Sequence, residues 1–435
     1  MDLVTSAMIT LGAIMVLGFI GNYIFNRSQI PSIVWLLIFG LIVGYIVREL
    51  GIINPANQYL LNVFSEFFAA IAIVIILFDG GINIDLYQLF KGAPRGLLLT
   101  VTNFCLTVII TMLIIFGISS LGILPISPDK SIIIGLVLGS MIGGTSSPIV
   151  IPLASKLKNL QEKTKMVTSI ESILTDPICI VVVLAIFYMI KFTGGIDIAL
   201  GARNLVSTFS AGIVLGIVFG LIWLFIMNKV RKEQFSYVLT LAVVFLVYSC
   251  VALIVGLDQG GTGAGAIACL MFGLVLGNGK KILRMIKYHG KGIEMDNETK
   301  QFHSLTSFVI RTFFFVYLGM IVAFQKTEFI LIGILILIFL ILARYITVLL
   351  STYKGNFEKD DMQTMITMMP RGLAAAILAI NFGPFFIQDF LGEETLTGFF
   401  TDVSFVIILG TAIICTIGVS YICRCEMKKI NYKKE

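Results

Sequence analysis

Two carboxylates, Glu171 and Asp176, lie in an otherwise apolar stretch that continues through residues 178–183. A charge at the depth of a bilayer is costly, so such a group usually belongs to an ion pathway or a proton relay and usually has a partner. On a helix, Ser172 and Asp176 lie one turn apart on the same face, whereas Glu171 and Asp176 diverge by about 140°. We therefore expect the two carboxylates to have different partners and different roles.

Asp176 is followed by Pro177, which cannot donate a backbone hydrogen bond. The carbonyl of Ile173 then loses its intrahelical partner and becomes a possible ligand close to the carboxylate. Burial disfavours the charged form of a carboxylate and a bound cation favours it, so one such group can hold H⁺ and a small cation by turns. We predict this role for Asp176. The alternative is a carboxylate permanently paired with an arginine.

Hydroxyl groups supply the candidate companions of this carboxylate. Na⁺ is a hard cation that prefers oxygen, so Thr145, Ser146 and Ser172 are candidate ligands together with freed backbone carbonyls. The alternative for each hydroxyl is to cap the backbone of an interrupted helix. With one titrating carboxylate, the simplest stoichiometry is one cation for one proton, which makes the exchange electroneutral.

The composition is that of an all-α polytopic membrane protein. The chain has 435 residues, of which 58% are hydrophobic and only 13% are charged, against roughly 25% charged in a soluble domain. The formal net charge of +6 comes from basic residues in loops and in the C-terminal tail, where membrane orientation explains them. The net charge therefore gives no reason to expect a nucleic-acid partner, and we also predict no cofactor and no enzymatic activity.

Apolar runs long enough to cross a bilayer set the predicted topology. An N-terminus outside and a C-terminus in the cytoplasm place most basic residues on the cytoplasmic side, as the positive-inside rule requires. The runs predict thirteen transmembrane helices, at residues 3–25, 33–47, 60–77, 96–118, 131–157, 165–190, 205–227, 235–255, 264–277, 304–324, 329–350, 362–381 and 403–422.

Two of these helices contain residues that break a helix. Glycines, hydroxyl residues and a proline at 143–148 interrupt the fifth, and residues 369–372 interrupt the twelfth. The interrupted helices are the fifth and the twelfth, an odd number of seven steps apart, so the breaks fall at matching places in two halves of opposite orientation. This position alone predicts two inverted six-helix repeats, whose discontinuous helices 5 and 12 cross at the midplane, the arrangement of secondary transporters.

Seven short motifs occur in order on the expected helices. None is specific alone, but together the chain resembles the NhaP-type sodium/proton antiporters, which are related to the animal sodium/hydrogen exchangers. The motifs lie at residues 77–81, 145–147, 171–172 with 176–177, 272–278, 311 with 313–319, 343–344 and 370–372.

The resemblance implies a homodimer in which a transport bundle moves against an interface region. Residues 1–95 and 191–327 would then form the interface and linker region, 96–190 and 328–422 the two halves of the bundle, and 423–435 a cytoplasmic tail. The resemblance also implies that Asp176 is the exchanging carboxylate, and that Thr145 and Ser172 contribute ligand oxygens. It further implies that Glu171 forms a structural ion pair with Arg344.

Other intramembrane charges match the family as well. The resemblance places Arg311 and Arg371 among its intramembrane arginines, and we interpret both as counter-charges to helix C-termini or to carboxylates. The sequence departs from the family at Ser146, where the family has aspartate, and at Thr175, where it has asparagine. Half-helix N-termini carry about +0.5 charge each, so a missing carboxylate weakens cation binding. Asp79 is a candidate for part of the neutralisation.

The sequence thus predicts exchange of a monovalent cation, Na⁺ or Li⁺, for H⁺ in the cell membrane. The alternative with the same fold, suggested by Ser146, is a K⁺/H⁺ antiporter or a weakly active regulatory homologue. An intramembrane aspartyl protease needs two facing aspartates, and only Asp176 is at mid-helix. A channel is expected to carry a filter motif, and none is visible in the sequence.

Overall fold

The computed structural model describes residues 3–28, 30–49, 55–84, 94–157, 160–193, 198–230, 235–256, 261–285, 297–322, 324 and 326–432. Within these ranges every regular element is a helix, and no strand occurs. The chain divides into two compact units. The first comprises Met1–Glu66, Ala93–Thr175 and Val309–Glu435, and the second comprises Phe67–Gly92 and Asp176–Phe308.

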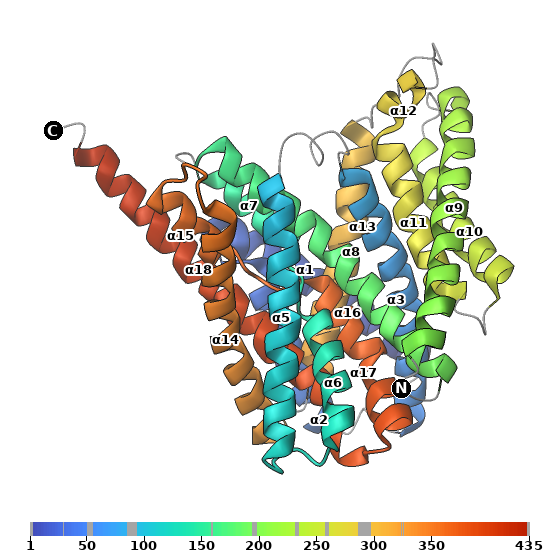
Figure 1. Cartoon of the computed structure of the whole chain (residues 1–435), viewed down its shortest axis with the longest axis horizontal. Helices are drawn as coiled ribbons and strands as arrows, with labels where there is room; N and C mark the ends of the chain where they lie inside the picture. Colours follow the sequence, from blue (N-terminus) through green and yellow to red (C-terminus); the bar gives the residue numbers. More distant parts are fainter. Residues whose placement is uncertain are drawn as a thin grey trace. The chain divides into compact units, whose positions relative to one another are not determined.

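The first unit is built around α5 (Pro94–Ser120), which packs along α6 (Pro128–Met141) and α14 (Thr327–Thr352) (Figure 1). Leu99 of α5 and Val348 of α14 are fully buried in one apolar cluster. The unit also contains α1 (Leu3–Ser28), α2 (Ser32–Glu49), α7 (Ser147–Lys156), α15 (Lys359–Thr367), α16 (Leu373–Asn381), α17 (Gly383–Phe385), η2 (Phe386–Leu391), η3 (Glu394–Leu396) and α18 (Phe399–Tyr432).

The second unit is organised around α11 (Gly261–Gly277), which packs against α9 (Ile198–Val230) and α10 (Ser236–Val255). Its apolar core includes Phe78 and Phe272, whose ring centroids lie 6.0 Å apart. It also holds α12 (Gly279–Met285). Three helices run from one unit into the other, namely α3 (Pro55–Asn83), α8 (Glu162–Thr193) and α13 (Asn297–Ile321).

The helices have the composition of membrane spans. Large apolar side chains point outward along α14, for example Leu331 and Ile338, which are 60% and 57% exposed, as expected where lipid replaces water. Six helices of the described residues are long and apolar enough to cross a membrane, or seven if Leu373–Asn381 and Gly383–Leu391, bent by 41°, form one span. The predicted all-α, multi-pass membrane class is therefore confirmed, while the count of thirteen and the inverted repeats remain predictions.

Individual helices match the predicted ranges to different degrees. Helices α5, α10 and α14 begin and end within two residues of the predicted bounds. Helix α3 runs on to Asn83, beyond the predicted end at residue 77, and α18 runs to Tyr432, into the predicted tail at 423–435. A helix continues through polar residues once it is nucleated, whereas hydropathy marks only its apolar part. Residues 433–435 of the tail and the segments 85–93 and 286–296 lie outside the described residues.

Both predicted interruptions are present. Helix α6 ends at Met141 and α7 begins at Ser147, while α15 ends at Thr367 and α16 begins at Leu373. Glycines at 143 and 144 and a proline at 148 disfavour a continuous helix at the first place, and a proline at 370 does so at the second. We call residues 142–146 the first break and residues 368–372 the second break.

Candidate functional site

The two breaks contact each other directly within the first unit. The backbone N–H of Ser146 in the first break donates to the carbonyl oxygen of Pro370 in the second, at 2.8 Å. Gly372 makes the close approach possible, because a Cβ at that position would lie 2.8 Å from the Cβ of Ser146. Two extended segments therefore cross where four half-helices end or begin.

An arginine holds the C-terminal end of α6 at this crossing. Arg371 of the second break is 1% exposed, and its Nη1 donates to the carbonyl oxygens of Gly143 and Gly144 at 2.8 and 3.1 Å. Its Nη2 donates to Thr107 Oγ1 at 3.4 Å, and its backbone N–H donates to Thr411 Oγ1 at 3.0 Å. A cation at the C-terminal end of a helix opposes the negative end of the helix dipole, so Arg371 caps α6.

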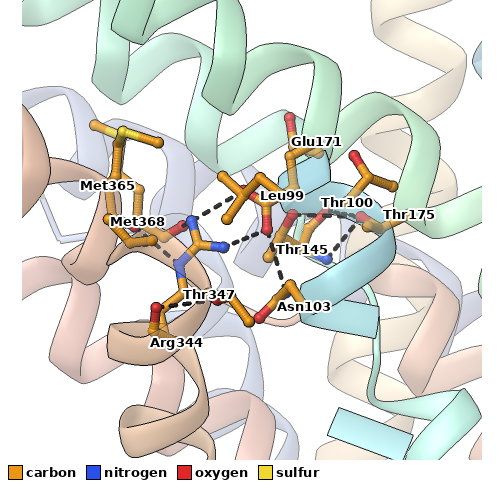
Figure 2. Close-up of polar contacts among 12 residues, drawn as sticks. Leu99, Thr100, Asn103, Thr145, Glu171, Thr175, Arg344, Thr347, Met365 and Met368 are labelled. Atoms are coloured by element: carbon orange, nitrogen blue, oxygen red, sulfur yellow. Dashed lines mark hydrogen bonds and ion pairs between the residues drawn. The ribbon is translucent and has the colours of Figure 1, made fainter. Parts of the chain in front are cut away.

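A second arginine holds the C-terminal end of α15, as Figure 2 shows. Arg344 of α14 donates from Nε to the carbonyl oxygen of Met365 at 2.9 Å and from Nη2 to that of Met368 at 3.0 Å. Its guanidinium also pairs with Glu171 of α8 through two hydrogen bonds, Nη1 to Oε1 and Nη2 to Oε2, the latter at 2.9 Å. Both side chains are 1% exposed. A fully buried ion pair thus links α8 and α14 to the end of α15.

The amide of Asn103 on α5 supports this pair from a third helix. Its Nδ2 donates to Glu171 Oε1 at 3.2 Å, and the residue is 1% exposed. Asn103 and Thr107 were not among the residues expected to contribute. The signal that could have found them is an amide inside an apolar run, with threonines one turn away on either side.

The hydroxyl groups around the first break hold the backbone. The N–H of Thr145 donates to Thr175 Oγ1 at 2.9 Å, and the hydroxyl oxygens of these two threonines lie 3.3 Å apart (Figure 2). Ser147 Oγ donates to the carbonyl oxygen of Ser172 at 3.3 Å, and Ser172 Oγ donates to that of Ser169 at 3.1 Å. The first break is therefore tied to α8 through Thr145, and the first turn of α7 is tied to the preceding turn of α8 through Ser147. The contribution of Ser147, like that of Thr175, was not expected from the sequence.

Asp176 directly follows Thr175 on α8 and is 8% exposed. Helix α8 continues without interruption through Pro177. Within the second unit, Pro177 lies against Gly80 of α3, where a Cβ would come 2.7 Å from Pro177 Cγ. Asp79 precedes that glycine, and Asn83 Nδ2 donates to its Oδ1 at 2.6 Å.

Two further residues singled out in the sequence, Ser146 and Arg311, differ in how deeply they are buried. Ser146 is 2% exposed at the crossing, and Arg311 lies partly buried on α13. No group of three or more metal-ligating His, Cys, Asp or Glu side chains occurs among the residues that the structure describes. Thr145, Ser146 and Ser172 belong to the first unit, and Asp176 is the first residue of the part of α8 that belongs to the second unit.

Known proteins resemble this chain over most of its length. The family model described as sodium/hydrogen exchanger, transmembrane, matches residues 12–425. The probable Na⁺/H⁺ antiporter 2 of Methanocaldococcus jannaschii is 25% identical over 311 residues, which cover 70% of this chain and 66% of that protein. The sodium/hydrogen exchanger 8 of Arabidopsis thaliana is 24% identical over 254 residues, 56% of this chain and 32% of that protein. The match spans less than two thirds of either relative.

Solved structures share the fold. The sodium proton antiporter MjNhaP1 from Methanocaldococcus jannaschii at pH 8 superposes with a TM-score of 0.75 at 22% identity, covering 95% of this chain and 99% of that one. An electron-microscopy structure of the same antiporter gives a TM-score of 0.71 at 23% identity, covering 97% and 96% of the two chains. At this level of identity the likeness concerns the fold.

Proposed function

We propose, from the premise that the chain belongs to the sodium/hydrogen exchanger family, that it exchanges a monovalent cation for H⁺ across a membrane. The observation that carries this proposal is the attachment of the first break to α8 beside the buried Asp176. Thr145 of the break is hydrogen-bonded to Thr175, the residue before that carboxylate. An interrupted helix next to a buried carboxylate is the arrangement in which secondary transporters bind their ions.

Asp176 is the exchanging group in this mechanism. A buried carboxylate is stable when it carries a proton or when a cation lies against it, and one site cannot hold both. Loading H⁺ from one side and Na⁺ from the other therefore couples the two flows. With one such carboxylate, one cation moves per proton, and the net charge transferred is zero.

Oxygen atoms near Asp176 are the proposed ligands of the cation. Ser172 lies one turn before Asp176 on the same helical face, and its hydroxyl keeps lone pairs while it donates to Ser169. The hydroxyl of Thr145 and that of Ser146 come from the first break. We propose Na⁺ as the principal cation and Li⁺ as a second, because both are hard cations that prefer oxygen.

The other charges have supporting roles in this proposal. Glu171 and Arg344 form the structural ion pair, and Arg371 fixes the crossing. Asp79 and Arg311 are proposed as supporting charges. We further propose that the protein works as a homodimer in the cell membrane, with its N-terminus outside and its C-terminus in the cytoplasm. The bundle formed by residues 96–190 and 328–422 would move against the remaining helices.

Ser146 favours one alternative function. It occupies the crossing at the first residue before α7, and it stands where the resembled family has a carboxylate. Without that negative charge, the site attracts a small, strongly hydrated cation less well. A K⁺/H⁺ antiporter, or a weakly active homologue with a regulatory role, is therefore the second candidate.

A vesicle assay tests these proposals. The purified protein is reconstituted into liposomes, and internal pH is followed after Na⁺, Li⁺ or K⁺ is added outside. We expect Na⁺ and Li⁺ to drive proton flux at a rate that an imposed membrane potential does not change. Asp176→Asn should abolish the flux while the protein remains folded. Retained exchange in this variant would contradict the proposal, and flux driven by K⁺ alone would favour the alternative.

A second buried aspartate serves as the matched control. It shows whether exchange is lost because Asp176 is changed or because any buried carboxylate is removed. Asp402 is 3% exposed and lies in the first turn of α18, outside α8 and the first break, and asparagine has nearly the same size and shape as aspartate. Asp402→Asn should therefore retain exchange. If it abolished the flux as completely as Asp176→Asn, the special role of Asp176 would be refuted.

A further inference from the structure

Helix α5 carries a stripe of polar side chains that faces the interior of the first unit. The stripe repeats every three or four residues, the spacing of one helical face. Every member is at most 1% exposed. An apolar span places such residues inside a protein when they have polar partners there. The members are Thr100, Asn103, Thr107 and Thr111.

Two neighbouring members of this stripe reach the two arginine caps, Asn103 through Glu171 and Thr107 directly. Asn103 donates to Glu171, and Glu171 is paired with Arg344, the cap of α15. Thr107 accepts from Arg371, the cap of α6. The two caps therefore reach the same face of α5 within one helical turn of each other. Residues one turn apart have Cβ atoms about 5–6 Å from each other.

One polar atom between the caps has no partner. Asn103 Oδ1 is buried and has no hydrogen-bond partner among the described residues. The amide orientation follows from its neighbour, because Glu171 needs a donor and would be repelled by the amide oxygen. A buried acceptor left unsatisfied is costly, and ordered water is the usual remedy where a second polar group is close.

Thr107 is that second polar group. Its contact with Arg371 Nη2, at 3.4 Å, exceeds the usual N–H···O distance of about 2.7–3.2 Å. Its hydroxyl therefore has capacity for a stronger bond. Two hydrogen bonds of about 2.8 Å that meet at one water molecule span roughly 4.5 Å, which suits polar atoms on side chains one turn apart.

We infer that a buried water molecule binds between Asn103 Oδ1 and Thr107 Oγ1 and joins the two arginine caps through α5. The water donates one hydrogen to the amide oxygen and bonds the threonine hydroxyl. A continuous set of hydrogen bonds then runs from the carbonyl oxygens at the end of α15, through Arg344 and Glu171, to those at the end of α6. Asn103 is thus a positioning residue that fixes the two breaks relative to each other.

A double-mutant cycle on the purified full-length protein tests this inference without depending on transport. Asn103→Leu and Thr107→Val each remove one end of the water site at nearly constant volume. Each single variant should lower the melting temperature. The drop in melting temperature of the double variant should be smaller than the sum of the two single drops, by at least about 2 °C. The reason is that the second substitution removes a bridge that the first has already broken.

The same stripe provides the control pair. Thr111 is buried and its Oγ1 has no hydrogen-bond partner within the part of the chain that the structure describes, but it lies two turns from Asn103. Asn103→Leu and Thr111→Val should therefore be additive. Additive losses for Asn103 and Thr107 as well would overturn the inference.

A conservative variant keeps the test decisive if Asn103→Leu does not fold. Thr107→Ser retains the hydroxyl, so it should keep the melting temperature and the apparent KM for Na⁺ close to those of the unchanged protein, while Thr107→Val shifts both. A density map that resolves ordered water should show a peak between Asn103 and Thr107. Equal losses in Thr107→Ser and Thr107→Val, or a protein atom in place of that peak, would refute the inference.

Discussion

The two breaks are capped in the same way but by arginines in different settings. At the end of α15, Arg344 comes from a separate helix and is paired with the carboxylate of Glu171. At the end of α6, Arg371 comes from the opposite break and bonds the neutral oxygens of Gly143, Gly144 and Thr107. One cap is held from outside the crossing, and the other is part of it.

Because of this difference, we expect the Arg344 cap to serve mainly the stability of the fold and the crossing to influence ion binding. A buried ion pair that fixes a helix end contributes to stability mainly because loss of either partner strands a charge. An arginine inside the crossing, by contrast, adds a positive charge next to the residues proposed to bind a cation. Changes at the Arg344 cap should therefore appear first in stability, and changes at the crossing should appear first in ion affinity.

The largest effect is expected at the Arg344 cap. Glu171→Ala or Arg344→Ala leaves one buried charge without its partner and should lower the free energy of unfolding by roughly 3–5 kcal/mol. Thermal unfolding in detergent measures this loss. Changing both residues together should cost less than the sum of the two single changes, because no charge is then stranded. A loss of exchange with unchanged stability would show that the pair belongs to the ion site.

The sequence predicted the breaks better than their partners. Gly143, Gly144 and Pro370 disfavour a helix through local backbone chemistry, which can be read from neighbouring letters. The pairing of Glu171 with Arg344 joins residues 173 positions apart, and only resemblance to a family suggested it. Spacing alone places a residue on a helix face but not opposite a particular neighbour.

Hydroxyl groups were the hardest to assign from the sequence. A threonine in an apolar helix commonly bonds the carbonyl four residues earlier, as Thr100 does with Gly96 at 2.8 Å. Nothing in the letters distinguishes it from Thr107, which accepts from an arginine instead. For the same reason the sequence did not show that Ser147, and not only Thr145, links this region to α8.

The next largest effect is expected from crowding the crossing. Gly372→Ala places a Cβ 2.8 Å from that of Ser146, so the two breaks must separate. Overpacking of this kind costs about 1–3 kcal/mol, and it should also slow exchange because both breaks shift. Gly117→Ala is the matched control, since a Cβ there meets nothing within 4 Å. Normal exchange and stability in Gly372→Ala would show that the crossing is not tightly packed.

A change of charge at the crossing should alter ion affinity. Ser146→Asp restores a carboxylate at the start of α7, opposes the positive ends of the half-helices and should lower the apparent KM for Na⁺ several-fold. Ser146→Asn has nearly the same size without the charge and controls for crowding against Gly372. An apparent affinity that fell or stayed level in Ser146→Asp would contradict the electrostatic account of the first break.

A loss of stability similar to that of Gly372→Ala is expected where the first break is tied to α8. Thr175→Val keeps the shape of the side chain but leaves the N–H of Thr145 without the acceptor that it has at 2.9 Å, which should cost about 1–3 kcal/mol. Thr175→Ser retains the hydroxyl and should behave like the unchanged protein. Because Thr145 is a proposed ligand, we also expect Thr175→Val to raise the apparent KM for Na⁺ more than it lowers the maximal rate. A lower maximal rate at constant KM would instead place Thr175 in the movement of the helices and not in the positioning of the site.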